Sequence, residues 1–315
     1  MNSDSAHAPE DFPASAAEPD VHILLPFWGD PDHLFTAVRS VLDQSDPRWR
    51  LTVLDDAYPD PQVAVFFAEL DDSRVDYVRH PENIGIARNF RRAAELASAP
   101  LCCIFGSDDI MGREFVATVR DLARRSPDVS IIQPAVEVLD DRGLPHLPLV
   151  DRVKQRLLAP RGHNRIARLR GQDLAASLLQ GNWLYWPSLV FRTATLQRHD
   201  FPDDLPIILD LALLVDIAFD DGQLLYAPGP PVFGYRRHAA SLSQRALVDG
   251  SRFRDERRFY RTVAARARAR GWRRAYAAAR LRLFSRLHAV TVLPTAFASR
   301  NRAGIASTLA HVFAF

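Results

Sequence analysis

Short apolar runs alternate with segments of helical periodicity through the first half of this chain, and this alternation constrains its fold more than any other feature. The apolar runs at 21–27, 51–54, 75–78, 101–105 and 129–133 are predicted to be strands, and 34–42, 62–70, 86–97 and 113–125 to be helices. Such an alternation forms a mostly parallel sheet with helices on both faces. We therefore predict an α/β fold with a Rossmann-like, doubly wound sheet, in which ligands bind at the carboxyl ends of the strands.

Two pairs of aspartates directly follow predicted strands. Asp55 and Asp56 come after the run at 51–54, and Asp108 and Asp109 come after the run at 101–105. Taken alone, each pair is better explained by a turn or a helix cap, where Asp is common. Oxygen-only sites also suit Mg²⁺ or Mn²⁺, which bind one or two carboxylates together with substrate phosphates. The residues alone are therefore compatible with a metal–phosphate site in one crevice.

Four motifs in a fixed order extend this interpretation. They are ILLPF at 23–27 with SVLDQ at 40–44, VLDDAYPD at 53–60, NIGIARN at 83–89 and IFGSDDI at 104–110. This series resembles the nucleotide-sugar half of glycosyltransferase family 2, whose members have the GT-A fold. The resemblance is strong over 21–113, weaker as far as 243 and absent in the tail of the chain.

The resemblance implies a binding site for a nucleotide-sugar donor, with a UDP- or dTDP-sugar favoured by family habit. Pro26 and Phe27 would line the nucleoside pocket. Asp55 or Asp56 would hydrogen-bond the base or ribose, and Arg88 would lie near the base or its phosphates. The other donor-binding residues implied are Asn83, Gly85, Ser107 and Arg237.

The same resemblance implies a divalent cation, Mn²⁺ or Mg²⁺, on the donor diphosphate. Asp108 matches the metal-binding second Asp of the family's DXD motif, whereas the first Asp is replaced by Gly106. A carboxylate is thereby lost, and Asp109 is expected to share the metal. The late segment YRRHAASLS at 235–243, after a strand predicted at 232–235, resembles a family motif near the diphosphate and adds His238 as a further ligand. A lone His is more often structural, but the neighbouring Arg residues favour a functional one.

The segment PIILDL at 206–211 resembles the family segment that carries the general base of an inverting transferase. That reaction needs a carboxylate to take the proton of the acceptor hydroxyl as its oxygen attacks the anomeric carbon. Asp210 is the predicted base, and its rivals are Asp203, Asp204 and Asp216. A helix predicted at 207–219 leaves the alternative that Asp210 only caps it.

Two other segments leave alternatives open. Basic residues gather at 144–170, which is predicted to be a solvated connection or, alternatively, a mobile loop that closes on an anionic ligand. The acceptor is expected near 181–186. Trp186 there would stack on a sugar, but it lies in an apolar run at 184–191, predicted to be a strand, and fits the core at least as well.

The tail at 251–315 carries 15 Arg and two acidic residues, a net charge of +13, so the remainder of the chain carries −11. The tail is predicted to be wholly helical. One stripe of it is apolar, at Trp272, Tyr276, Ala279, Leu283, Leu287 and Val290. Such a helix lies on an anionic membrane surface, or it packs on the acidic body with its Arg residues facing solvent.

These observations divide the chain into a disordered segment at 1–20, a GT-A domain at 21–250 and the Arg-rich tail at 251–315. Within the domain, 21–113 is the nucleotide half and 114–250 the acceptor half. No signal peptide or membrane-spanning run is recognised, so we expect a cytoplasmic protein, with peripheral contact at the inner face of the cell membrane through 272–290 as one alternative. Cys102 and Cys103 are predicted to be buried and unpaired, because adjacent strand residues point to opposite faces.

We expect a glycosyltransferase, inverting and metal-assisted, that acts on a sugar, lipid-linked or protein acceptor in cell-surface polysaccharide, glycolipid or glycoprotein assembly. A nucleotidyl-transferring enzyme would need a Gly-rich phosphate loop after the first strand, which PFWG at 26–29 lacks. Gly106 leaves open a catalytically inactive family member that acts as a scaffold. The Arg-rich tail also suggests nucleic-acid binding, but the acidic body and the lack of a recognised module count against it.

Overall fold

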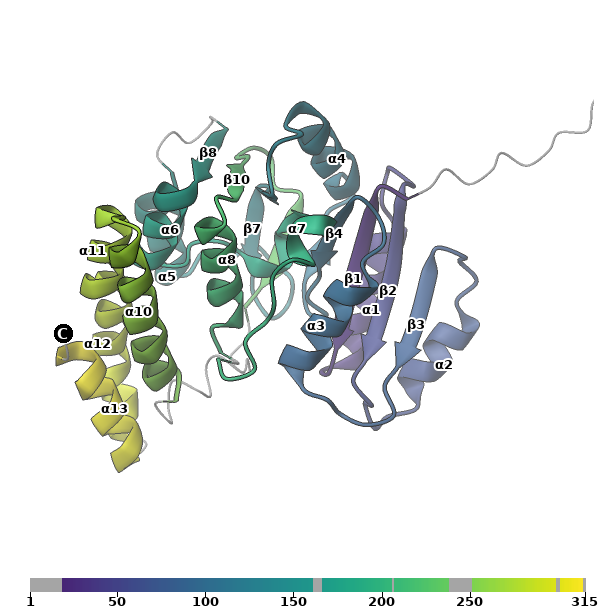
Figure 1. Cartoon of the computed structure of the whole chain (residues 1–315). Helices are drawn as coiled ribbons and strands as arrows, with labels where there is room; N and C mark the ends of the chain where they lie inside the picture. Colours follow the sequence, from purple (N-terminus) through teal and green to yellow (C-terminus); the bar gives the residue numbers. More distant parts are fainter. Residues whose placement is uncertain (1–18, 161–165, 206, 238–250, 299–300, 314–315) are drawn as a thin grey trace, which may run out of the picture.

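The computed structural model of the protein describes residues 19–160, 166–205, 207–237, 251–298 and 301–313. Its centre is an eight-stranded sheet with the strand order β3-β2-β1-β4-β9-β6-β10-β8 (Figure 1). The strands are β1 (Val21–Phe27), β2 (Trp49–Asp55), β3 (Val75–Arg79), β4 (Leu101–Ile104), β6 (Ile131–Gln133), β8 (Ala167–Arg170), β9 (Val190–Arg192) and β10 (Gln223–Tyr226). All are parallel to one another except β8 and β9, which run antiparallel to their neighbours.

The central strands are buried on both faces. In β1, Ile23 and Leu25 point into one core cluster and Leu24 into the other, as the two-residue period of a strand requires. Cys102 and Cys103 in β4 likewise point into opposite clusters and are free thiols, which confirms the prediction. Burial raises the pKa of Cys102 to about 12 and that of Cys103 well above its ordinary value, so neither is a reactive thiolate at neutral pH.

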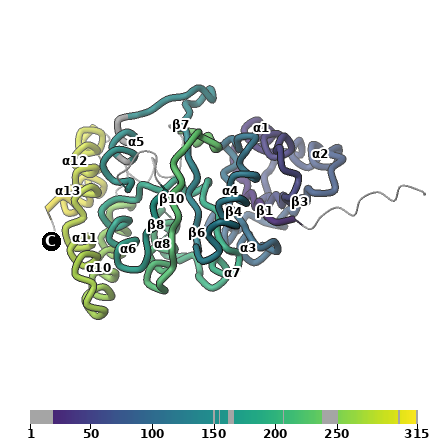
Figure 2. The backbone as a smooth tube through the Cα atoms, turned by 90° about the horizontal axis from the view of Figure 1, so that it is seen from above, coloured from purple at the N-terminus to yellow at the C-terminus, as the bar shows by residue number. Residues whose placement is uncertain are grey.

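Helices cover both faces of the sheet. One face is covered by α1 (Pro31–Leu42), α2 (Gln62–Glu69) and α4 (Phe115–Arg125), and the other by α3 (Ile86–Leu96), α6 (Gly171–Gln180), α7 (Thr193–Leu196) and α8 (Leu209–Phe219). Figure 2 shows α1 and α3 on opposite sides of β1 and β4. A small sheet of β5 (Ile110–Met111), β11 (Phe233–Arg236) and β7 (Val136–Leu139) packs beside the main one. The predicted doubly wound α/β fold is confirmed.

Two segments differ from the sequence prediction. The basic region at 144–170 contains α5 (Leu149–Val153), a π-helical turn η1 (Lys154–Leu158) and β8, rather than a plain connection. The apolar run at 184–191 is divided into a 3₁₀ turn η2 (Trp186–Ser188) and the strand β9. Pro187 within the turn has no N–H to give to a sheet ladder, which explains the division. The strands β7, β8 and β10 were not predicted from the sequence.

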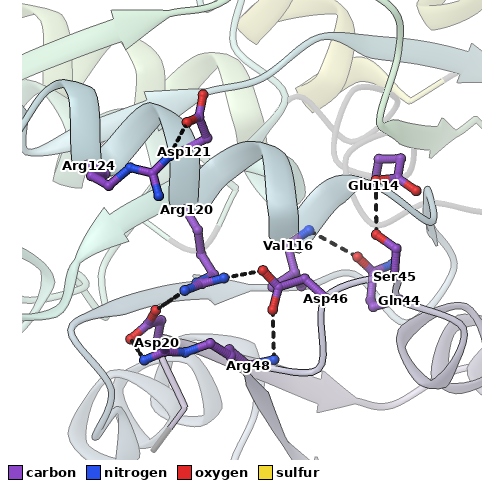
Figure 3. Close-up of polar contacts among 10 residues, drawn as sticks. All are labelled: Asp20, Gln44, Ser45, Asp46, Arg48, Glu114, Val116, Arg120, Asp121 and Arg124. Carbon is purple, nitrogen blue, oxygen red and sulfur yellow. Dashed lines mark hydrogen bonds and ion pairs between the residues drawn. The ribbon is translucent and has the colours of Figure 1, made fainter. Parts of the chain in front are cut away.

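Polar contacts fasten the start of β1 to α4 (Figure 3). Asp20 accepts a hydrogen bond from Arg120 Nε at 2.6 Å, and the same guanidinium donates to Asp46. Gln44 Oε1 accepts the N–H of Val116 at 3.0 Å. Because that N–H belongs to the first turn of α4 and has no partner within the helix, the contact caps α4. Asp20 ends the segment predicted to be disordered, yet it is held in place.

Where it is described, the tail forms four helices, which stand together at one end of the molecule, far from β3 and α2 (Figures 1 and 2). They are α10 (Ser251–Ala269), α11 (Arg273–Leu281), α12 (Leu283–Ala298) and α13 (Arg302–Phe313). Val263 of α10 and Ala275 of α11 join the core cluster that also contains α6 and α8. Within the described ranges, no helix is long and apolar enough to cross a membrane.

The predicted apolar stripe of the tail is broken at Arg282. This residue has a left-handed backbone with φ of 48°, and it separates α11 from α12. On the α11 side, Trp272 and Tyr276 pack against the core. On the α12 side, Leu283 and Leu287 are exposed. Packing on the body therefore accounts for α11 but not for the outer face of α12.

We expect Phe191→Ala to lower the free energy of unfolding by about 3–5 kcal/mol, because truncating a buried Phe leaves a cavity. Phe191 is fully buried in β9, the strand that joins β4 to β6, and its ring packs against Trp186. Urea unfolding followed by circular dichroism measures the change. As a control, Val65→Ala on the exposed side of α2 should change it by less than about 0.5 kcal/mol. An equal, small effect of both substitutions would show that β9 does not hold the halves of the sheet together.

Candidate functional site

The carboxyl ends of β1, β2 and β4 meet at one edge of the sheet. Phe27 and Asp55 pair at the last position of the β1–β2 register, and Leu24 pairs with Ile104 at the end of β4. The loops that follow are also close, since a Cβ on Gly29 would lie 4.0 Å from Ser107 Oγ. The segments that carry the two Asp pairs therefore end at the same edge, as the parallel sheet predicts.

Asp55 is fully buried at the end of β2 and is held by three groups. Its Oδ1 accepts the N–H of Tyr58 at 2.7 Å, and its Oδ2 accepts the Tyr77 hydroxyl and Arg79 Nη1, the latter at 3.1 Å. Burial and the bond to Asp55 raise the pKa of Tyr77 to about 12, so its hydroxyl stays protonated as a donor. Asp55 thus connects the turn that follows β2 with the strand β3. Its contact with a base or ribose stays a prediction.

Asp56 is also buried, and both of its oxygens accept main-chain N–H groups. The Oδ1 atom accepts from Ile84 at 2.7 Å and the Oδ2 atom from Gly85 at 3.0 Å. Gly85 has φ of 81°, a backbone conformation that favours glycine, and it directly precedes α3. Asp56 therefore sets the path of the loop that enters α3.

A second buried polar residue holds α3 against β2. Asn89 donates from Nδ2 to the carbonyl of Leu54 at 3.1 Å, and its Oδ1 lies 3.1 Å from His80 Nε2. Besides Gly85, the residues of the motif at 83–89 that are predicted to bind the donor are Asn83 and Arg88. Both are exposed on the outside of the same loop and helix. They are available to a ligand, whereas Asp56 and Asn89 shape the loop that presents them.

The aromatic side chains at the end of β1 are divided between core and surface. Phe27 is fully buried, so its side chain lies in the core rather than along a pocket, and Pro26 before it is partly buried. Trp28 is 54% exposed, and its ring meets Tyr58 edge-on at 5.5 Å between centroids. Trp28 was not predicted to be a site residue. Its signal was a large aromatic residue placed directly after a buried strand, where ligands bind.

The loop after β4 places its two aspartates differently. Asp108 and Ser107 are partly buried, whereas Asp109 is almost wholly buried. Asp109 Oδ1 accepts the N–H of Arg236 at 2.8 Å, and its Oδ2 has no hydrogen-bond partner among the described residues. Burial, followed by the charge of Asp108, raises the pKa of Asp109 well above its ordinary value. The carboxylate predicted to share the metal is thus turned into the protein.

The position of Asp109 explains why residue 106 departs from the DXD pattern. A Cβ on Gly106 would overlap Asp109 Oδ2 and would lie 3.1 Å from Asp108 Oδ1. The space in which the side chain of an Asp at 106 would begin is therefore filled by the carboxylate of Asp109. A Cβ at this position would therefore require the Asp109 side chain to shift.

The strand β11 supports the same loop from the second half of the chain. Arg236 is buried, and its Nε donates to the carbonyl of Asp108 at 2.7 Å while its Nη1 donates to the carbonyl of Asp141 at 2.8 Å. This side chain therefore clamps the main chain of Asp108 in place. His238, the predicted third metal ligand, lies outside the described residues.

Arg237, predicted to bind the donor, is held by a buried carboxylate. Its guanidinium donates to both oxygens of Asp151 at 2.5 and 2.8 Å, and Asp151 also accepts the Tyr185 hydroxyl at 3.2 Å. Burial and the charge of Asp151 raise the pKa of Tyr185 above its ordinary value. Asp151 was missed because a single Asp within a basic segment has no sequence signal.

Asp210 lies in the first turn of α8, where its Oδ2 accepts a hydrogen bond from Asn182 Nδ2 at 3.0 Å. Its rivals are ion-paired on the surface of the molecule. The pairs are Asp216 with Arg266 at 2.5 Å, Asp203 with Arg91 at 3.3 Å and Asp204 with Arg258 at 3.1 Å. Asp210 is thus the candidate that a neutral donor orients, in the region where the acceptor was expected.

The two tryptophans of the expected acceptor region belong to the core. Trp183 is buried and donates to Ser177 Oγ at 3.0 Å, and Trp186 stacks on Phe90 with 6.0 Å between ring centroids. Both side chains pack in the cluster beneath α8. The core interpretation of Trp186 is therefore the one that the structure supports.

A metal ion at this site would need ligands from the substrate in addition to those of the protein. In the part of the chain that is described, no group of three or more His, Cys, Asp or Glu side chains is placed to hold a metal. The nearby carboxylate that is partly exposed is Asp108, whereas Asp109 is turned into the protein and its Oδ2 has no hydrogen-bond partner among the described residues. An oxygen-only set of this size fits Mg²⁺ or Mn²⁺ when substrate phosphates and water complete the coordination.

Comparison with solved structures shows the class of fold. The structure of residues 1–349 of S. aureus TarS aligns with a TM-score of 0.62 at 12% identity, over 84% of this chain and 72% of that chain. The complex of that fragment with UDP-GlcNAc aligns with a TM-score of 0.61 at 13% identity, over 78% of this chain and 66% of that chain. The chain thus has a GT-A glycosyltransferase fold.

Sequence comparison names the family. Residues 22–187, more than half of the chain, match glycosyl transferase family 2, and the chain belongs to that family of glycosyltransferases. The provisionally named teichuronic acid biosynthesis glycosyltransferase TuaG of Bacillus subtilis (strain 168) is 32% identical over 93 residues, which are 29% of this chain and only 37% of that relative. The uncharacterised protein MT1568 of Mycobacterium tuberculosis is 22% identical over 238 residues, 71% of this chain and 69% of its own length.

Gly106→Ala should lower the free energy of unfolding by about 1–3 kcal/mol, because its Cβ would overlap the Asp109 carboxylate. In an Asp109→Ala background the same substitution should cost less, since the oxygen that it meets is gone. Chemical unfolding of the four proteins in this cycle measures the coupling. Gly229→Ala is the control, because a Cβ there has no neighbour within 4 Å. Additive effects at 106 and 109 would contradict the packing account.

Proposed function

We propose that the protein is a metal-assisted, inverting glycosyltransferase that moves a sugar from a nucleotide-sugar donor to an acceptor hydroxyl. The observation that carries the proposal is the convergence, at one sheet edge, of exposed aromatic surface on Trp28 and of the Asp108 loop, which Arg236 clamps. A nucleotide needs an aromatic or apolar face for its base and a cation site for its diphosphate, and this edge offers candidates for both.

The donor would lie across the ends of β1, β2 and β4, with its base near Trp28 and Tyr58. The loop fixed by Asp56 presents Arg88 and Asn83 beside it. TarS, which shares the fold, has been solved with UDP and with UDP-GlcNAc, and this supports a UDP-sugar as the first donor to test. The identities of the nucleotide and of the sugar in the natural donor belong to the proposal.

Asp108 is the residue that we assign to the metal, together with the donor diphosphate. A bound Mg²⁺ or Mn²⁺ would offset the negative charge that gathers on the departing diphosphate. Asp109 accepts the N–H of Arg236 close to this point, and the Arg236 side chain keeps the main chain of Asp108 in position. The assignment of His238 as a further ligand, and of Arg237 to the diphosphate, is part of the same proposal.

Asp210 is the proposed general base. It would take the proton of the acceptor hydroxyl as the oxygen forms its bond to the anomeric carbon, while the bond from that carbon to the diphosphate oxygen breaks and its electron pair leaves with the diphosphate. A single displacement of this kind inverts the anomeric centre. Asn182 orients the Asp210 carboxylate by donating to its Oδ2 atom.

The acceptor class is proposed from the family. A sugar, lipid-linked or protein hydroxyl in the assembly of a cell-surface polysaccharide, glycolipid or glycoprotein fits a transferase whose relative TuaG is named for teichuronic acid biosynthesis. The packing of Gly106 against Asp109 also favours a second candidate, an inactive scaffold, because the site lacks one carboxylate of the DXD pattern.

Thermal unfolding with UDP, dTDP, GDP and CDP, each with and without Mn²⁺, tests donor and metal together. A nucleotide at 100 times its Kd adds about 2.7 kcal/mol. We expect one nucleotide to raise the Tm by roughly 2–4 °C per kcal/mol, and only with Mn²⁺. The Mn²⁺-dependent part should vanish in Asp108→Ala and remain in the control Asp203→Ala. No shift with any of the four nucleotides would favour the inactive scaffold.

Asp210→Asn should slow sugar transfer by about 10²–10⁴-fold, the usual contribution of a general base, without weakening nucleotide binding. Hydrolysis of the donor by water provides a readout that needs no natural acceptor, and the Tm shift with nucleotide reports binding. Asp204→Asn, which removes a surface ion-pair partner of Arg258, is the matched control. Turnover within a few fold of the unaltered protein would remove Asp210 from the mechanism.

A further inference from the structure

The outer face of α12 carries a continuous apolar stripe. Leu283 is 57% exposed, Leu287 52%, Val290 46% and Phe297 55%. Their spacing of four, three and seven residues puts all four on one side of the helix. Single exposed apolar residues are ordinary, but a stripe that runs the length of a helix is typical of an interaction surface.

The other face of α12 is anchored, so the stripe is not the result of a loosely packed helix. Ala289 is fully buried against Phe253 of α10. Ser285 donates to the buried Glu256, and its Oγ lies 2.7 Å from Nε2 of the buried His311 on α13. Polar and apolar contacts thus fix which side of α12 packs and which side faces outward.

A basic pocket adjoins the start of this stripe. It lies between α10 and α11 and has a volume of about 600 Å³. Its polar and aromatic lining consists of Arg261, Arg268, Arg280, Arg282, Tyr260 and Tyr276, together with small alanines and no Asp or Glu. Leu281 and Leu283, each 57% exposed, flank Arg282 of the pocket lining in the chain.

Three of the four arginines that line the pocket make no ion pair within the described residues. Among the described residues, no ion pair joins Arg261, Arg268 or Arg280 to a carboxylate. Burial, followed by the charge of Arg286, lowers the pKa of Arg282, whereas Tyr260 and Glu256 act in the opposite direction. A cluster of guanidinium groups with an opening of this size recognises a phosphate group.

The net charge of the chain is also unevenly distributed, with the positive charge in the tail. The segment 251–315 carries a net charge of +13 and the rest of the chain −11. Because the tail helices stand at one end of the molecule, the positive charge is concentrated at that end (Figures 1 and 2). A flat anionic surface would attract this end and repel the body, which orients the protein before any contact forms.

We propose that the tail helices dock on an anionic phospholipid surface, with a lipid phosphate in the pocket between α10 and α11 and the apolar stripe of α12 among the lipid chains. A basic rim beside an amphipathic helix is the combination that binds the interface of an anionic bilayer without crossing it. The docking depends on the proposed function in one respect only: the purpose that we assign to it is access to a lipid-linked acceptor.

Vesicle flotation of the full chain tests the docking. We expect binding to vesicles of equal parts phosphatidylglycerol and phosphatidylcholine, and at least about tenfold weaker binding to phosphatidylcholine alone. Leu283→Ser with Leu287→Ser, and separately Arg268→Gln with Arg280→Gln, should each weaken binding to the mixed vesicles by about tenfold or more. Absence of binding to the mixed vesicles at low ionic strength would overturn the proposal.

Matched controls separate this surface from general stickiness. Val65→Ser with Leu144→Ser removes two equally exposed apolar side chains outside the tail, and Arg142→Gln with Arg198→Gln removes two exposed charges there. Both control pairs should bind the mixed vesicles like the unaltered protein. Equal losses in the control pairs and the tail pairs would mean that the tail is not the docking site. All variants should retain the Tm shift with nucleotide and Mn²⁺, so that failure of docking is distinguishable from failure of the donor site.

Two further measurements decide between the lipid and other occupants. Titration with inorganic phosphate and with glycerol 1-phosphate, followed by the Tm, tests whether the pocket takes a free phosphate. A strong response without vesicle binding would reassign the pocket to a soluble ligand. Light scattering after gel filtration tests a second copy of the chain as the occupant. A dimer that dissociates in Leu283→Ser with Leu287→Ser would replace the lipid surface by a protein interface.

Discussion

A carboxylate that leaves water has to be given hydrogen bonds or a positive charge, and at the loop edge of this sheet several carboxylates impose that condition at once. Asp55, Asp56, Asp109 and Asp151 are all buried. Their partners come from β3, from the loop before α3, from the main chain of β11 and from the guanidinium of Arg237. Satisfying them ties together segments that are distant in the sequence. The loops on which a donor would rest are thereby ordered by the protein alone.

The sequence was most informative where burial and local geometry agree. Strands covered on both faces are continuous apolar runs, so β1 was predicted with the bounds that it has, and the parallel sheet then placed Asp56 and Asp108 at one edge. The tail was correctly predicted to be helical where it is described. Each of these inferences depended on neighbours within a few residues along the chain, which a pattern can record.

The remaining features depended on partners that no pattern records. Asp109 turns inward because it meets the N–H of Arg236, 127 residues further along the chain, and nothing near Asp109 indicates this. Asp151 can be buried because Arg237 pairs with it. Trp28 became a candidate only because the structure places its neighbour Phe27 in the core. The DXD departure at Gly106 was visible in the sequence, but the carboxylate of Asp109 that lies where its Cβ would be was not. In the candidate site, therefore, the pattern predicted which sheet edge carries the aspartates, and it did not predict how their side chains are oriented.

The left-handed backbone of Arg282 has a geometric consequence for the whole tail. In an unbroken helix, Leu283 and Leu287 would continue the line of Trp272 and Tyr276 and would be carried toward the core with them. A single residue with φ of 48° changes the direction of the chain, and the side of α12 that would have been internal becomes external. One backbone dihedral thus decides whether the same row of apolar side chains belongs to the interior of the protein or to its surroundings. The residues of this repeat pack against the core before Arg282 and are exposed to the surroundings after it.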